Sequence, residues 1–262
     1  MHEIVGRFAP TPSGRMHLGN LFCALLAWLS VRAAGGRMIL RVENLDLLRT
    51  SFDYARQMEE DLRFLGLDWD EGGSLGGSNG PYYQSERTPY YESLLERLTA
   101  KGLVYPCFCS RAQLHAAQAP HTADGEVVYS GVCRNLSPAE LEVRARTRPP
   151  ALRLRVPAET ISLTDGHYGP YQQRLDTQCG DFILRRSDGV FAYQLAVVAD
   201  DAAMGVTQVV RGRDLLPSAP RQIYLFRLLG FQPPAFVHTP LLLAHDGRRL
   251  SKRDGDLDLD GL

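Results

Sequence analysis

The sequence has no apolar run that approaches the roughly 18 to 20 residues of a membrane-spanning helix, which excludes an integral membrane protein. Its first residues lack the basic start and the small-residue cleavage site of a signal peptide, so we expect a cytoplasmic protein. Nor is the composition that of a disordered chain, because 44% of the 262 residues are hydrophobic and 23% are charged. The length allows one large α/β domain, or a core domain with a small insertion.

An excess of charge of either sign is also absent, because 29 basic and 30 acidic residues give a net charge of -1. Nucleic-acid binding would therefore require a local patch of cations. Cysteine is scarce: the five residues form an odd number, and only Cys107 and Cys109 lie close together in the sequence. This count does not fit a disulfide framework and favours a reducing compartment, in which the cysteines can bind a metal.

The hydrophobic pattern at the start of the chain predicts a strand, a loop, a helix and a second strand. This order is a βαβ unit, so we expect a parallel sheet. The predicted strands are 3–8, 37–43, 151–156, 160–163, 181–185 and 235–243, and the predicted helices are 17–34, 53–65, 88–101, 138–146 and 218–229.

The distribution of cysteine divides the chain into parts. Residues 104–150 hold Cys107, Cys109 and Cys133. We interpret them as an insertion between two halves of one α/β domain, 1–103 and 151–253. The final segment, 254–262, is an acidic tail.

The loop between the first predicted strand and the first predicted helix carries the most informative residues. In parallel sheets, ligands bind at the carboxyl ends of strands, against the N-terminus of a helix. Gly19 would let a ligand approach the backbone closely. His17 can donate to a phosphate from the first turn of the helix, although a capping or surface histidine is the alternative.

A second informative segment follows the last predicted strand. Arg248, Arg249, Lys252 and Arg253 lie close together and repel one another unless an anion binds among them. The alternative is a solvated basic loop.

Together the two segments resemble the class I aminoacyl-tRNA synthetases, whose two ATP motifs are His-x-Gly-His and Lys-Met-Ser-Lys-Ser. Here they read HLGN at 17–20 and RLSKR at 249–253. Asn20 replaces the second His and Arg249 the first Lys, and both replacements keep a hydrogen-bond donor. The resemblance implies ATP with Mg²⁺, and His17 and Lys252 as the catalytic residues. It implies these ATP contacts: His17, Gly19, Asn20, Arg249, Ser251 and Lys252.

Further motifs narrow the resemblance to the glutamyl branch of the class. Within it the chain is similar to the glutamyl-Q tRNA(Asp) synthetases, which are short relatives of glutamyl-tRNA synthetase. The resemblance implies an α/β fold, with a Rossmann-like parallel sheet in a nucleotide-binding catalytic domain, a small zinc-binding insertion and no anticodon-binding domain. Asn44 and the pair 47–48 depart from the usual Asp and Pro-Pro. The motifs are RFAPTPSG-x-x-HLGN from 7, RVENLD at 41–46, YQSER at 83–87 and VRGRDLL-x-S-x-PRQI at 210–223.

Recognition of glutamate requires cations for its two carboxylates and an acceptor for its ammonium. Arg7 ends the first predicted strand and is suited to a carboxylate, while Glu43 ends the second and is suited to the ammonium. Arg211 lies in a run of β-branched residues, where an unpaired charge is costly. Tyr193 could instead be a core residue. The resemblance implies these glutamate contacts: Arg7, Ala9, Glu43, Tyr193 and Arg211.

The cysteines of the insertion predict a zinc site. Cys107, Cys109 and Cys133 supply three thiolates, and zinc takes four ligands. By chemistry alone, His115 or His121 could complete the set, and three reduced cysteines without a metal are the alternative. The resemblance implies one structural Zn²⁺ and an unusual tyrosine ligand, in this set: Cys107, Cys109, Tyr129 and Cys133.

The resemblance also implies the reaction: a monomer activates L-glutamate with ATP, without RNA, and transfers it to the queuosine base in the anticodon loop of tRNA(Asp). Two alternatives remain open. One is a discrete or truncated glutamyl-tRNA synthetase that acts on tRNA(Glu), and the other is a non-catalytic paralogue. These arginines are candidate RNA contacts, or a solvated surface: Arg144, Arg146, Arg148, Arg153 and Arg155.

Overall fold

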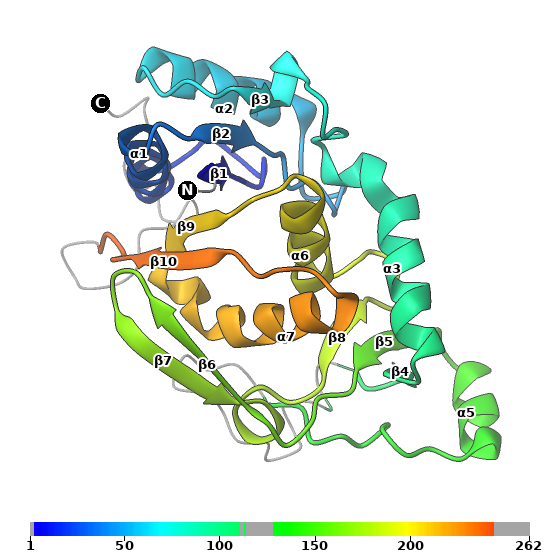
Figure 1. Cartoon of the computed structure of the whole chain (residues 1–262). Helices are drawn as coiled ribbons and strands as arrows, with labels where there is room; N and C mark the ends of the chain where they lie inside the picture. Colours follow the sequence, from blue (N-terminus) through cyan, green and yellow to red (C-terminus); the bar gives the residue numbers. More distant parts are fainter. Residues whose placement is uncertain (1–2, 111–112, 114–127, 244–262) are drawn as a thin grey trace.

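A parallel sheet in the strand order β10-β9-β1-β2-β3 forms the centre of the fold (Figure 1). The computed structural model describes residues 3–110, 113 and 128–243. All strand pairs in this sheet run parallel, which confirms the expectation from the βαβ pattern. The strands are β1 (Val5–Phe8), β2 (Arg37–Leu40), β3 (Glu71–Gly72), β9 (Gln208–Gly212) and β10 (Ala235–Thr239).

Both faces of the sheet are buried, because successive side chains of a strand enter different hydrophobic clusters. Met38 and Leu40 of β2 belong to one cluster, while Ile39 between them belongs to the other. Val209 and Val210 of β9 divide in the same way. This alternation follows from the two-residue repeat of a strand, and burial on both faces is typical of parallel sheets covered by helices.

Helices cover each face of the sheet. Leu21, Ala24 and Val31 of the first helix point into the cluster that contains Met38, at the spacing of one helical face. No helix in the described part of the chain has the length and hydrophobicity that a membrane crossing requires. The helices on this face are α1 (Leu18–Ala33) and α2 (Phe52–Phe64), and those on the other face are α3 (Thr88–Ala100), α6 (Tyr193–Ala203) and α7 (Ala219–Leu229).

The middle of the chain adds a smaller antiparallel sheet, in the order β4-β5-β8, and a two-stranded ribbon of β6 and β7 (Figure 1). A short helix, α5, belongs to the same part of the chain. The bounds are β4 (Val104–Cys107), α5 (Pro138–Ala145), β5 (Ala151–Leu154), β6 (Thr160–Asp165), β7 (Gly169–Arg174) and β8 (Phe182–Arg185). The short 3-10 and π helices are η1 (Gly73–Leu75), η2 (Gln84–Arg87), η3 (Leu175–Cys179) and η4 (Arg213–Ser218).

Some strands differ from the sequence prediction for identifiable reasons. β2 ends at Leu40, and Val42 then forms a single bridge to Tyr83. β10 ends at Thr239 because Pro240 follows and has no N–H to donate. β7 was not predicted, because its sequence GPYQQR is polar and most of its side chains are not buried.

A buried histidine connects the ribbon of β6 and β7 to the parallel sheet through a hydrogen bond. His238 of β10 and Asp165 at the end of β6 are both fully buried, and Nδ1 of His238 lies 2.6 Å from Oδ2 of Asp165. The backbone N–H groups of His167 and Tyr168 also donate to this carboxylate, at 3.0 and 2.9 Å. The carboxylate accepts a hydrogen bond from Nδ1–H, so Nε2 of the ring is the acceptor for Nε of Arg211, at 3.0 Å.

This arrangement predicts that acid destabilises the protein through His238. Burial, together with the charge of Arg211, lowers the pKa of His238 to about 4. The pKa of a histidine in an unfolded chain is about 6.5, so the unfolded state takes up the proton first as the pH falls. The free energy of unfolding should therefore decrease between about pH 6.5 and 4, by about 3 kcal/mol from this residue.

Urea unfolding at several pH values measures this effect. In His238→Gln the decrease over the same pH window should be smaller by about that amount. An equal decrease in the variant and the unaltered protein would contradict the assignment to His238.

Candidate active site

A cavity of about 770 Å³ opens at the carboxyl ends of β1 and β9, beside the N-terminus of α1. This is the edge at which parallel sheets of this type bind ligands. The basic loop with Arg249, Ser251 and Lys252 lies outside the described residues. All other residues that the sequence assigned to ATP or glutamate line the cavity: Arg7, Ala9, His17, Gly19, Asn20, Glu43, Tyr193 and Arg211.

His17 and Asn20 close the N-terminus of α1 as a reciprocal capping box. Nδ1 of His17 accepts the backbone N–H of Asn20 at 3.3 Å, and Oδ1 of Asn20 accepts the backbone N–H of His17 at 3.3 Å. The proton of the neutral His17 ring is therefore on Nε2. A Cβ on Gly19 would lie 3.0 Å from the His17 ring, so glycine leaves room for the imidazole. The capping and phosphate-donor interpretations of His17 are thus compatible, because they use different ring nitrogens.

Arg211 is a buried cation that donates, in the described part of the chain, only to uncharged acceptors. On β9 its Nε donates to His238, and Nη1 donates to Oε1 of Gln222 at 2.8 Å. Nη1 also lies 3.5 Å from the Tyr193 hydroxyl, and Nη2 donates to the carbonyl of Leu215 at 3.2 Å. Burial lowers the pKa of Arg211. In the described part of the chain no carboxylate pairs with this guanidinium, so an anionic ligand in the cavity would offset its desolvation.

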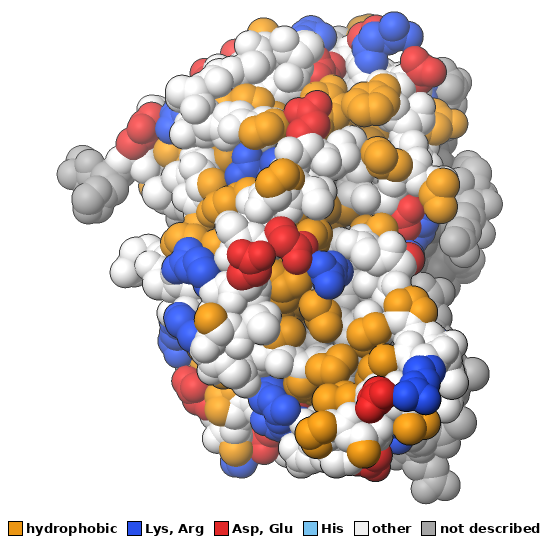
Figure 2. Space-filling model, turned by 90° about the vertical axis from the view of Figure 1, so that its right-hand side faces the viewer, with side chains coloured by type: hydrophobic (Ala, Val, Ile, Leu, Met, Phe, Trp, Pro, Cys, Tyr) orange, Lys and Arg blue, Asp and Glu red, His pale blue; other side chains and the backbone are white. Residues whose placement is uncertain are grey.

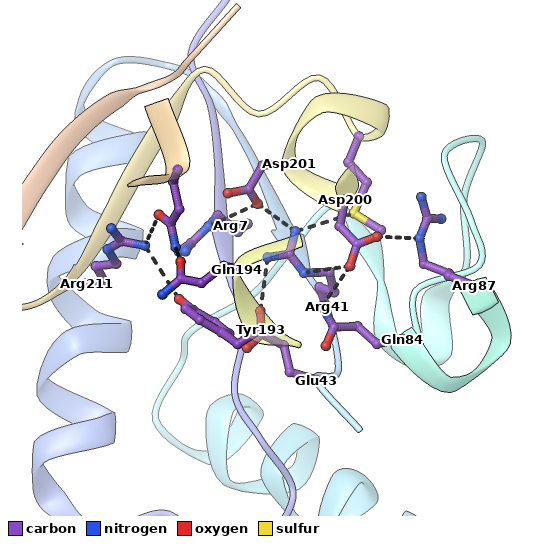
Figure 3. Close-up of polar contacts among 12 residues, drawn as sticks. Arg7, Arg41, Glu43, Gln84, Arg87, Tyr193, Gln194, Asp200, Asp201 and Arg211 are labelled. Carbon is purple, nitrogen blue, oxygen red and sulfur yellow. Dashed lines mark hydrogen bonds and ion pairs between the residues drawn. The ribbon is translucent and has the colours of Figure 1, made fainter. Parts of the chain in front are cut away.

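Arg7 and Glu43 bring one further charge of each sign to the cavity (Figure 3). Arg7, on β1, donates to the carbonyl of Val210 at 3.4 Å, and its Nε lies 3.4 Å from Oδ1 of Asp201. Glu43 accepts from Nη2 of Arg41 at 3.1 Å. Burial raises the pKa of Glu43, and the charges of Arg41 and Arg7 oppose this shift.

The signs of these charges define the ligand that the cavity fits. Arg7 and Arg211 are cations and Glu43 is an anion, so a ligand with two carboxylates and one ammonium would pair with all three. The helix N-terminus at His17, in the same cavity, fits a phosphate. The cavity therefore has the charge pattern for an acidic amino acid beside a nucleotide phosphate.

Asn44 and Asp46 hold the loop after β2, in which the pair 47–48 replaces the usual Pro-Pro. Asn44 donates to Oγ of Ser85 at 2.9 Å and accepts the backbone N–H of Ser85 at 3.0 Å. Asp46 accepts from Nη1 of Arg186 at 3.0 Å. Leu48 is 98% exposed and contributes nothing to this anchoring.

A second cavity, of about 810 Å³, adjoins the first, and Glu43 and Tyr193 are among the residues that line both. It extends to Cys107 and Cys109 of the cysteine cluster. Several of its residues carry no role predicted from the sequence. Asp46 and Gln84 lie within the motifs RVENLD and YQSER, which could have pointed to them. Arg186 and Asp188 lie in a polar turn that carries no such signal.

The three cysteines predicted to bind zinc lie together in the structure. The Sγ atoms of Cys107, Cys109 and Cys133 are all within 4.8 Å of one another. The Tyr129 hydroxyl lies 3.5 Å from Sγ of Cys107 and 4.0 Å from that of Cys109. His115 and His121 lie outside the described residues.

The chemistry of this cluster fits a metal ion. Burial and the charge of Cys107 raise the pKa of Cys109 to about 12, so metal binding would have to displace its proton. The guanidinium of Arg153 lies 3.8 Å from the Tyr129 ring centroid, and Nη1 of Arg144 lies 3.7 Å from Sγ of Cys133. These cations would offset the negative charge of several thiolates around one divalent ion.

The candidate RNA arginines do not form one exposed surface. Arg153 is buried and donates to the carbonyl of Asp181 at 2.7 Å, and Arg146 pairs with Glu142 at 2.6 Å. Arg148 lines the second cavity. Figure 2 shows that, on the face where α3 lies in Figure 1, basic and acidic side chains of the described residues alternate with hydrophobic ones.

Comparison with known proteins agrees with the motifs. The chain resembles the glutamyl-Q tRNA(Asp) synthetase of Symbiobacterium thermophilum, with 56% identity over 99% of this chain and 81% of that protein. The corresponding protein of Nitratidesulfovibrio vulgaris is 52% identical over 99% of this chain and 81% of its own length. A glutamate–tRNA ligase of Sulfurihydrogenibium is 40% identical, over 98% of this chain and 54% of the ligase.

A solved structure of a glutamate-tRNA synthetase also resembles this chain. The glutamate-tRNA synthetase of Elizabethkingia anophelis superimposes with a TM-score of 0.84 and 32% identity, over 97% of this chain. The chain spans about half of that protein, since 53% of it is covered. Residues 3–260 match the model of the family "tRNA synthetases class I (E and Q), catalytic domain". The chain therefore belongs to this family of class I tRNA synthetases.

Proposed function

We propose that this chain activates L-glutamate with ATP to glutamyl-adenylate, and then transfers the glutamate to the queuosine base in the anticodon loop of tRNA(Asp). The observation that carries the proposal is the cavity in which Arg7, Arg211 and Glu43 lie beside His17. Relatives at 47–56% identity that are named for this activity support it, and glutamate–tRNA ligases match at 40–46%. Transfer of glutamate to tRNA(Asp) is therefore preferred to transfer to tRNA(Glu).

In the first step, a carboxylate oxygen of glutamate attacks the α-phosphorus of ATP, and pyrophosphate leaves. The protein aligns two anions and stabilises the charge of the transition state. We assign this role to Nε2 of His17 with the N-terminus of α1, and to Lys252. Mg²⁺ bound to ATP would neutralise charge on the phosphates. The ATP contacts that we propose are Gly19, Asn20, Arg249 and Ser251.

Glutamate is recognised by charge in this proposal. Arg7 and Arg211 bind its carboxylates, and Glu43 binds its ammonium. Tyr193 and Ala9 form the adjacent wall, and the Tyr193 hydroxyl contacts Arg211 at 3.5 Å. A side-chain amide would leave one buried guanidinium without an anion, so glutamine should bind much more weakly.

The second step requires that the acceptor nucleoside reaches the adenylate. An acceptor hydroxyl attacks the carbonyl carbon of the adenylate, and AMP leaves. The second cavity gives room for this nucleoside, because it adjoins the first cavity at Glu43 and Tyr193, which line both. Arg148 and Arg186 line it and could pair with phosphates of the RNA.

We further propose one structural zinc ion on Cys107, Cys109, Tyr129 and Cys133. Zinc would fix these four side chains, and two of them line the second cavity. The zinc site thus belongs to the RNA side of the enzyme. It would be carried by the insertion, 104–150, between the two halves of the catalytic domain. The reduced thiols of this site fit a cytoplasmic location.

The activity is tested by two assays on the intact chain. ATP–pyrophosphate exchange should require glutamate but no RNA. Transfer of radiolabelled glutamate should occur to tRNA(Asp) that carries queuosine, and should drop by at least about a hundredfold on the same tRNA without it.

A variant of His17 and a second tRNA serve as controls for these assays. His17→Ala should reduce exchange by about a hundredfold or more, because it removes a phosphate donor. Labelling of tRNA(Glu) instead of tRNA(Asp) would favour the glutamyl-tRNA synthetase alternative. Absence of exchange under all conditions would favour a non-catalytic paralogue.

The zinc proposal predicts about one zinc per chain in the purified protein. Cys133→Ser should lose the metal and lower the melting temperature by about 5 °C or more, whereas Cys179→Ser, a buried cysteine outside the cluster, should retain the zinc. Elemental analysis and thermal unfolding measure both effects. Equal zinc content in the two variants would refute this ligand set.

A further inference from the structure

A row of four charges of alternating sign connects the two amino-acid contacts from behind the cavity (Figure 3). Oδ1 of Asp201 lies 3.4 Å from Nε of Arg7 and accepts from Nη1 of Arg41 at 2.6 Å. Nη2 of Arg41 then donates to Oε1 of Glu43 at 3.1 Å. A single carboxylate oxygen of Asp201 is thus shared by two guanidinium groups.

We propose that Asp201 and Arg41 are positioning residues for the glutamate substrate, and that they fix the distance and orientation between Arg7 and Glu43. Neither residue lines either cavity, so both would act through the side chains that do. The inference rests on the proposed function, because that function makes Arg7 and Glu43 the partners of the substrate.

Burial makes this row stiff. Arg41 is fully buried, and Asp201 and Arg7 are each only 4% exposed. A buried ion is stable only when its partners remain in place, so the four side chains hold one another in a single arrangement. The row also joins distant parts of the chain, since Arg41 follows β2, Asp201 is on α6 and Arg7 is on β1.

The neighbouring aspartate provides a contrast. Asp200 accepts from Nε of Arg87 at 2.6 Å, from Gln84 at 2.7 Å and from the Tyr91 hydroxyl at 2.9 Å. These contacts tie α6 to η2 and α3. Oδ2 of Asp200 also lies 3.8 Å from Nε of Arg41, so Asp200 touches the row at Arg41 but contacts neither Arg7 nor Glu43. Asp201 is therefore the aspartate that joins Arg7 to Arg41, whereas Asp200 joins helices and meets the row only at Arg41, over a longer distance.

The row also controls the charge of Glu43. Burial raises the pKa of this carboxyl, and Arg41 is the strongest opposing charge. Without the charge of Arg41, Glu43 would be protonated at higher pH and would lose its attraction for the substrate ammonium. The charged and titratable groups around Glu43 are Arg7, Arg41, Asp46, Arg49, Tyr193 and Asp201.

The test is ATP–pyrophosphate exchange without RNA, in the intact chain, with KM determined separately for glutamate and for ATP. Asp201→Asn and Arg41→Gln should each raise the glutamate KM by about ten- to a hundredfold and change the ATP KM by less than about threefold. Arg87→Gln is the matched control: it also removes a buried arginine, next to Asp200, and should leave the glutamate KM within about threefold of the original.

Two further measurements separate positioning from loss of stability. The glutamate KM of Arg41→Gln should increase more steeply than that of the unaltered protein as the pH falls from about 8 to 6. Asp201→Glu keeps the charge and should recover part of the affinity lost in Asp201→Asn. Equal losses for glutamate and ATP, or the same glutamate effect in Arg87→Gln, would overturn the inference. Absence of glutamate-dependent exchange in the unaltered protein would instead refute the proposed function.

Discussion

The structure depends on how a few buried charges are balanced at the carboxyl end of the parallel sheet. Arg211 has only uncharged acceptors in the described part of the chain, while Arg7 and Glu43 are held by an ion row behind the cavity. Burial of ions is costly unless each one has partners. The uncompensated charge therefore faces the cavity, where an acidic amino acid can complete the balance.

The fold explains why this balance is possible. Parallel strands end at one edge, so β1 and β9 deliver Arg7 and Arg211 to the same cavity, although the two arginines are far apart in the sequence. The capping box of His17 and Asn20 places a helix N-terminus beside them. The ribbon adds a distant support, because Asp165 orients His238, which in turn accepts from Arg211.

Local sequence patterns predicted the parts that depend on neighbouring residues: the βαβ unit, the helix capped by His17, and the cysteine cluster. The motifs also placed Arg7, Glu43 and Arg211, and the structure brings these into one cavity. The sequence could not predict that Arg41 and Asp201 pair, because such a contact depends on tertiary packing of segments 160 positions apart. The polar strand β7 was missed for a related reason, since its pairing with β6 leaves one face in solvent.

Calorimetric titration with free amino acids, in the absence of ATP and RNA, is the most direct test of the central claim. L-glutamate should bind, and L-glutamine and a glutamate with an acetylated amino group should each bind at least about a hundredfold more weakly, because each loses one charge contact. Similar affinities for glutamate and glutamine would contradict the claim that the buried cations select the ligand by its two carboxylates.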